Sequence, residues 1–180
     1  MNKESVLGIA VALIVGILGG FLIFSMSTRK DTPAPVAGVP AGGGSPADYE
    51  KRIAEAQKIV ARDPKNFEAW VMLGNDYFDT SRPQKAIEAY GKALELNPNS
   101  PNILTDQGVM YRQVGWYDKA LENFQKAQQI DPKHIQSLYN IGIVYRQDLK
   151  QPEKALKPWS RILEIDPASP TAAQVRPTVE

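Results

Sequence analysis

The sequence predicts an all-α solenoid, a stack of helix–turn–helix repeats, because one pattern of small and aromatic residues recurs about every 34 residues. In each copy a glycine on one helix is followed by an alanine and an aromatic residue on the next helix, and then by a proline. Small residues allow two helices to approach closely, and a proline disfavours helical backbone in the residue before it. The first copy consists of Trp70, Leu73, Gly74, Tyr77, Ala86, Tyr90, Ala93 and Pro98. The second consists of Leu104, Gly108, Tyr111, Ala120, Phe124, Ala127 and Pro132. The third, with one residue inserted between Asp148 and Gln151, consists of Leu138, Ile141, Gly142, Tyr145, Ala155, Trp159 and Pro167.

This pattern resembles the tetratricopeptide repeat (TPR), whose helix pairs stack into a right-handed solenoid. The resemblance assigns residues 67–100, 101–134 and 135–169 to three TPR units. It implies that function resides in a concave groove lined by the first helix of each repeat. Within each helix the carried-over groove positions are three or four residues apart, so they share one helical face. The resemblance places these partner-binding residues in the groove: Val71, Asn75, Phe78, Thr105, Val109, Arg112, Tyr139, Asn140, Ile143 and Arg146.

Two alternatives remain open for these groove residues. The three aliphatic residues Val71, Val109 and Ile143 could instead pack against a neighbouring helix. For the arginines, the first interpretation is a site for a partner carboxylate, since a guanidinium suits bidentate contacts with carboxylates. In the second, both arginines form ion pairs across the repeats with Asp79 or Asp106.

The two ends of the stack are predicted from helix start and stop signals. Ser45 followed by Pro46, with an acidic residue three positions after the serine, marks the start of a capping helix in residues 46–66. Residues 170–180 form a C-terminal tail in this prediction, with a short helix that Pro177 stops. The apolar surface of the last repeat would then be either an open partner site or a face partly covered by this tail.

An uncharged segment in residues 5–26 predicts a single transmembrane helix, because about 20 apolar residues cross a bilayer core of about 30 Å. A cleaved signal peptide is the alternative. Flanking Lys and Arg residues are nearly balanced, so the orientation rests on analogy with bacterial signal anchors. That analogy predicts a single-pass protein of the inner (cytoplasmic) membrane with its repeats in the periplasm. Small residues at every fourth position would let two such helices approach closely in a homodimer: Gly8, Ala12, Gly16 and Gly20. The alternative is that they have no such role, because Gly and Ala are common in transmembrane helices.

Residues 27–45 are predicted to be a flexible linker between this anchor and the repeats. From Thr32 to Ser45 the sequence is TPAPVAGVPAGGGS, which has no charged and no aromatic residue. Such a segment buries too little apolar surface to fold. It therefore tethers the repeats near the membrane.

Composition excludes several classes of function. With 21 Lys and Arg against 20 Asp and Glu the chain is nearly neutral, whereas nucleic-acid binders carry a basic stripe. There is no cysteine, which excludes thiol catalysis, covalent haem attachment and cysteine-based metal sites. The single histidine, His134, is expected to be a surface residue of a turn. We therefore expect no enzyme, no cofactor and no metal.

The sequence as a whole predicts a membrane-anchored TPR scaffold that binds a peptide or an unfolded segment of a partner protein. The order of anchor, linker, capping helix and repeats also resembles the membrane-tethered repeat subunits of bacterial cytochrome c maturation. Those subunits present unfolded apocytochrome to a haem lyase, and their partner carries a C-x-x-C-H motif. A third hypothesis is a structural component of an envelope-assembly or secretion complex.

Overall fold

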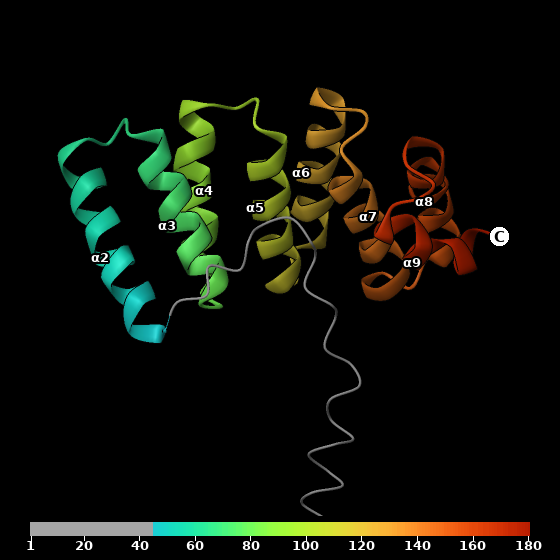
Figure 1. The fold of residues 1–180 in the computed structure, drawn as a ribbon, viewed down its shortest axis with the longest axis horizontal. Coiled ribbons are helices and arrows are strands. Elements are labelled where there is room, and N and C mark those ends of the chain that lie inside the picture. Colours follow the sequence, from blue (N-terminus) through green and yellow to red (C-terminus); the bar gives the residue numbers. More distant parts are fainter. Residues whose placement is uncertain (1–44) are drawn as a thin grey trace, which may run out of the picture. The chain divides into compact units, whose positions relative to one another are not determined.

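The computed structural model describes residues 45–180, and every regular element in that range is a helix (Figure 1). Each helix packs against the one before it and the one after it, so the helices follow one another in a row from α2 to α9. The α-helices are α2 (Pro46–Arg62), α3 (Phe67–Asp79), α4 (Pro83–Leu96), α5 (Pro101–Gln113), α6 (Tyr117–Ile130), α7 (Ile135–Ile143), α8 (Pro152–Ile165) and α9 (Pro170–Val179). A short π-helix, η2 (Val144–Asp148), continues α7.

The transmembrane helix predicted for residues 5–26 lies outside the described residues, as does nearly all of the linker. Between residues 45 and 180, no helix is both long enough and apolar enough to span a bilayer. The anchor, its orientation and the homodimer through its small residues therefore stay predictions.

The repeat glycines bring the two helices of each TPR unit together, but their neighbours are aromatic rings rather than the alanines predicted from the sequence. A Cβ atom added to Gly108 would lie 2.5 Å from the Phe124 ring. Gly74 faces Tyr90 in the same way, and Gly142 faces Trp159. These rings are 2% exposed or less. Each glycine thus provides the space for a large buried ring that arises four residues after the alanine.

Helix α2 covers the first end of the stack, as its start signal predicts. Ser45 accepts a hydrogen bond from the backbone N–H of Asp48, and the Asp48 carboxylate accepts one from the backbone N–H of Ser45. This reciprocal capping box satisfies two free donors at the helix start. One apolar stripe of α2 is buried in the core that it shares with α3 and α4, and it consists of Ile53, Ala56 and Val60.

The residue inserted in the third repeat is accommodated by the π-helix η2. The backbone N–H of Leu149 donates to the carbonyl of Val144, five residues earlier, at 2.9 Å. A π-turn holds one residue more than an α-turn, so the chain gains a residue without breaking the helix. After η2, helix α8 begins at the same position of its repeat as α4 and α6 do in theirs.

The C-terminal end differs from its prediction, because Pro177 does not stop the last helix. Helix α9 runs from Pro170 to Val179 with Pro177 inside it. The proline removes one hydrogen-bond donor, but α9 is held by packing, since Ala172 and Val175 are buried in one cluster with Trp159. The apolar face of the last repeat is therefore partly covered by the C-terminal residues, which is the second of its two predicted outcomes. Helix α8 likewise continues through Pro158.

Candidate partner-binding face

The first helices of the three repeats share one surface, here called the A-helix face, on which seven of the ten predicted groove residues are accessible. Arg146 is exposed on it. The half-buried members are Val71, Asn75, Phe78, Val109, Arg112 and Tyr139. Met72, beside Val71 on α3, is 44% exposed. Most of the accessible apolar surface therefore lies on the first of the three helices.

The other three predicted groove residues are buried: Thr105 and Asn140 do not lie at an accessible surface as predicted, and Ile143 follows the alternative of packing against neighbouring helices. Thr105 and Asn140 are each 2% exposed and Ile143 is 7% exposed. Ile143 packs in the C-terminal core cluster, and Asn140 donates to the carbonyl of Gln136 within its own helix, at 2.8 Å. Helices α5 and α7, the first helices of neighbouring repeats, are also in direct contact.

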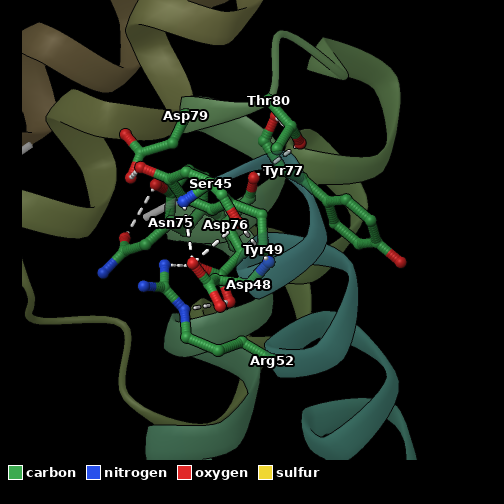
Figure 2. Close-up of polar contacts among 10 residues, drawn as sticks. Ser45, Asp48, Tyr49, Arg52, Asn75, Asp76, Tyr77, Asp79 and Thr80 are labelled. Carbon is green, nitrogen blue, oxygen red and sulfur yellow. Dashed lines mark hydrogen bonds and ion pairs between the residues drawn. The ribbon is translucent and has the colours of Figure 1, made fainter. Parts of the chain in front are cut away.

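A polar network fixes α2 on the first repeat beside the A-helix face (Figure 2). Arg52 of α2 forms an ion pair with the carboxylate of Asp76, which is 1% exposed. The same guanidinium lies over the ring of Tyr49, 4.6 Å from its centroid, and the Tyr49 hydroxyl donates to Asp79 at 3.4 Å. The buried aspartate is therefore neutralised by a cation from the neighbouring helix.

Asn75 is held in a defined orientation on this face. The hydroxyl of Tyr90, a side chain 1% exposed, donates to Asn75 Oδ1 at 2.9 Å. Asn75 Nδ2 donates no hydrogen bond to any of the described residues. The amide thus offers two N–H donors at the half-buried surface of α3.

Two carboxylates give the first two repeats a negative charge on the A-helix face. Burial, together with the nearby charge of Asp79, raises the pKa of Asp106 to about 7. Burial also raises the pKa of Asp79, although the Tyr49 hydrogen bond lowers it. Within residues 45–180 neither carboxylate has a Lys or Arg within ion-pair distance. A positively charged group of a partner would stabilise the ionised form of both carboxyl groups.

The arginines have different surroundings from those predicted. Arg112 forms an ion pair with Asp148, with 2.5 Å from Nε to one carboxylate oxygen and 3.2 Å from Nη2 to the other. Neither Asp79 nor Asp106 is its partner. The guanidinium of Arg146 lies over the Trp159 ring, 5.6 Å from its centroid. Arg146 therefore remains accessible to a carboxylate, whereas the charge of Arg112 is already neutralised.

His134 is not the exposed turn residue that its place after Pro132 predicts. It is half-buried and caps α7, because its Nδ1 accepts a hydrogen bond from the backbone N–H of Ser137 at 3.3 Å. Its Nε2 lies 2.8 Å from Asn102 Oδ1 on α5, which joins two repeats. Burial lowers its pKa. The repeat register could have revealed this role, since His134 occupies the position at which Asn66 caps α3.

No cluster of His, Cys, Asp and Glu side chains in the described range has the composition of a metal site. The chemistry of the A-helix face is consequently that of apolar contact, amide hydrogen bonds and isolated charges.

Comparison with known families supports the repeat assignment directly. Sequence models described as "Tetratricopeptide repeat" match residues 67–100, 89–122 and 136–169. One described as "TPR repeat" matches residues 108–148. Together the matches extend without a gap from residue 67 to residue 169, more than half of the chain.

Curated relatives are similar to this chain over the repeats alone. Photosystem I assembly protein Ycf3 of Synechococcus sp. is 32% identical over 72 residues, which are 40% of this chain and 42% of that protein. General transcriptional corepressor trfA of Dictyostelium discoideum is 39% identical over 72 residues, 39% of this chain and 5% of the relative. The bifunctional subunit NrfFG of the formate-dependent nitrite reductase complex of Haemophilus influenzae is 36% identical over 55 residues, 31% of this chain and 14% of the relative. The matched segments thus span less than half of each relative.

Among solved structures, the crystal structure of MamA has a TM-score of 0.64 and 25% sequence identity, covering 67% of this chain and 70% of MamA. The Arabidopsis OM64 TPR domain has a TM-score of 0.58 at 19% identity, covering 63% and 93% of the two chains, and shows the fold alone. The chain is thus built on an all-α solenoid of a kind that serves as a protein-interaction scaffold, and its residues 67–169 belong to the tetratricopeptide repeat family.

Proposed function

We propose that this chain is a membrane-anchored scaffold that binds an extended or unfolded segment of a partner protein along the A-helix face. The observation that carries the proposal is the accessible apolar surface of α3, where Met72 is 44% exposed beside the half-buried Val71 and Phe78. Several apolar side chains on one accessible face are a common mark of a protein-binding site. The proposal assigns the chain no catalytic step.

The polar groups of the face determine which segment fits. Asn75 is oriented by Tyr90, so its free N–H groups are placed to donate to a peptide carbonyl. Asp79 and Asp106 favour a basic side chain near the first two repeats. Arg146 favours a carboxylate near the third repeat. A partner segment with apolar residues and a basic residue followed by an acidic one matches this order of charges.

The membrane part of the proposal rests on sequence. The uncharged segment from Val6 to Met26 suits a single-pass anchor in the inner membrane, with the repeats in the periplasm. An alkaline phosphatase reporter fused after Glu180 tests on which side of the membrane the repeats lie. Activity in intact cells supports the periplasmic location, and an inactive but expressed reporter contradicts it.

Two narrower functions each have one specific observation in their favour. The order of anchor, linker, capping helix and repeats, which resembles that of the membrane-tethered repeat subunits of cytochrome c maturation, favours a role in that process, with apocytochrome as the partner. Similarity to a photosystem I assembly protein favours a structural role in the assembly of a larger membrane complex.

Crosslinking from the A-helix face distinguishes these functions. A photo-reactive residue at Met72 should capture the partner in native membranes, whereas one at Leu156 on α8, 40% exposed, serves as the control. Mass spectrometry then identifies the captured segment. A C-x-x-C-H motif near the crosslink supports cytochrome maturation, and a folded complex subunit supports the assembly role. Equal capture of one partner from both positions would contradict binding at the A-helix face.

A further inference from the structure

A hollow lies between α4 and α6, on a side of α5 other than the A-helix face. Its volume is about 510 Å³, within the range of about 300–1,000 Å³ that is common for ligand pockets. The side chains of α5 that line it are spaced three and four residues apart and alternate with those of the A-helix face. The lining consists of Leu94, Pro98, Leu104, Gln107, Tyr111, Lys119, Glu122, Asn123 and Lys126.

Two amide side chains in this pocket replace residues that are not amides at the corresponding positions of the other repeats. Gln107 stands where the first and third repeats have Leu73 and Ile141. Asn123 stands where they have an alanine and a proline. Both amides are buried, at 6% and 7% exposure. Polar residues at positions that a repeat otherwise keeps apolar are expected where a protein trades stability for function.

The hydrogen bonds of these amides leave one acceptor at the pocket wall without a donor among residues 45–180. Gln107 Nε2 donates to the carbonyl of Ile87 at 2.9 Å. Asn123 Nδ2 donates to Gln107 Oε1 at 2.8 Å and to the carbonyl of Leu104 at 3.3 Å. Both of these bonds use the N–H groups of Asn123, and its Oδ1 accepts no hydrogen bond from residues 45–180. This oxygen is not one of the fully buried unpaired atoms of the described range, so it is open to solvent at the pocket wall, where a donor from a ligand can take the place of water.

The rim of the pocket carries a cation that is not neutralised by a carboxylate. Lys126 forms an ion pair with Glu122 at 2.8 Å. The Lys119 ammonium instead lies over two rings, 4.5 Å from the centroid of Trp116 and 5.6 Å from that of Tyr111. No carboxylate in the described range is within ion-pair distance of Lys119. Its charge is therefore available to a ligand.

From these three features we propose that the pocket is a second protein-binding site, for a peptide segment in which an acidic residue follows an aliphatic one. The aliphatic side chain packs against Leu94 and Leu104, and a backbone N–H of the segment donates to Asn123 Oδ1. The acidic side chain pairs with Lys119. With the A-helix face occupied by one segment, this site lets the chain hold a second segment at the same time.

A labelled peptide tests the site with the full-length chain. The probe is fluorescein-Gly-Ser-Leu-Glu-Ser-Gly-amide, and binding is followed by fluorescence anisotropy. We expect saturable binding that weakens about tenfold, the effect of about 1.4 kcal/mol, when the leucine of the probe is replaced by alanine or its glutamate by lysine. Equal binding of the three probes would overturn the proposal.

Variants of the chain locate the binding. Lys119→Glu and Asn123→Ala should each weaken binding of the leucine–glutamate probe at least about fivefold. Alanine is the residue that the first repeat has at the position of Asn123. Circular dichroism checks that both variants keep their helix content. Lys85→Glu is the matched control, because Lys85 lies over Tyr77 at 5.6 Å in the first repeat just as Lys119 lies over Tyr111. Unchanged binding by Lys119→Glu, or an equal loss with Lys85→Glu, would refute the site.

A substitution on the other face keeps this test separate from the proposed function. Met72→Glu places a charge on the A-helix face and should leave probe binding unchanged. If Met72→Glu abolishes binding, the probe occupies the A-helix face, so the second site is refuted while the proposed function stands.

Discussion

Arg112 Nε lies 2.5 Å from a carboxylate oxygen of Asp148, so an ion pair joins the second repeat to the third. Asp148 ends the π-helix η2, which holds the residue inserted in the third repeat. The ion pair turns a predicted ligand-binding arginine into a structural one.

The first prediction concerns this pair. Both side chains are largely buried, at 23% and 16% exposure, so Arg112→Ala should destabilise the fold by about 1–2 kcal/mol through the loss of charged hydrogen bonds. Urea melts followed by circular dichroism measure the loss. Arg146→Ala is the control, since Arg146 is exposed and contacts a ring face only. Equal stability of the two variants would contradict a structural role for Arg112.

The sequence predicts the features of the fold that depend on residues at fixed positions of the repeat. Three helix pairs, their order and the capping helix α2 follow from glycines, prolines and aromatic residues at fixed spacing, because each of these residues acts on the backbone of its own helix. Burial of Thr105, Asn140 and Ile143 could not be predicted in this way. It depends on packing between helices, as Ile143 packs in the C-terminal cluster with Trp159 and Val175, and the residue spacing of one repeat does not determine that packing.

The structure differs from the sequence-based prediction at two further places, Pro177 and His134, and each difference has a local cause. Pro177 was expected to stop a helix, yet packing of Ala172 and Val175 offsets the single hydrogen-bond donor it removes. The capping role of His134 was missed because histidine is an uncommon N-cap. Its place in the register, one repeat after Ser100 and two after Asn66, was the available signal.

The second prediction concerns the glycine contacts. Gly108→Ala should destabilise the fold by about 1–3 kcal/mol, because its Cβ would lie 2.5 Å from the buried Phe124 ring. Gly91→Ala is the matched control: its Cβ meets only Gln107 Nε2, at 3.4 Å, and alanine favours helix by about 1 kcal/mol. Denaturant melts should therefore show opposite changes. A Gly108→Ala protein as stable as its parent would disprove the close contact.

The third prediction concerns pH. The pKa of Asp106 is about 7 in the folded chain and 3.8 in an unperturbed carboxyl group, so the folded state binds more protons between these values. Stability should therefore fall as the pH rises through that window. Asp106→Asn should reduce this slope and raise the stability at about pH 8 by about 1 kcal/mol or more. Thermal melts across the window measure both effects.

Asp118→Asn provides the comparison for that experiment, because Asp118 is exposed on α6. The slope of stability against pH should change more in Asp106→Asn than in Asp118→Asn. The assigned burial of Asp106 would be wrong if Asp106→Asn and Asp118→Asn gave the same slope.

The fourth prediction concerns the helix cap of α7. His134→Ala removes the acceptor for the Ser137 backbone N–H and the contact with Asn102, and it should cost about 1 kcal/mol of stability. Ser100→Ala is the control at the same register position, since the Ser100 side chain makes no capping hydrogen bond in α5. Binding of the partner should be unchanged in both variants. If His134→Ala and Ser100→Ala lost the same stability in melting experiments, the capping role of His134 would be wrong.

The affinity of the captured partner segment for a Met72→Glu variant is the most direct test of binding at the A-helix face. Met72 is 44% exposed, so the substitution leaves the core intact and places a charge on the proposed apolar contact surface. Ile130→Glu on α6, at a residue 40% exposed, is the matched control. Calorimetric titration with the synthetic segment should show at least about a tenfold higher Kd for Met72→Glu, about 1.4 kcal/mol, and no change for Ile130→Glu. An unchanged Kd for Met72→Glu would contradict the proposed function.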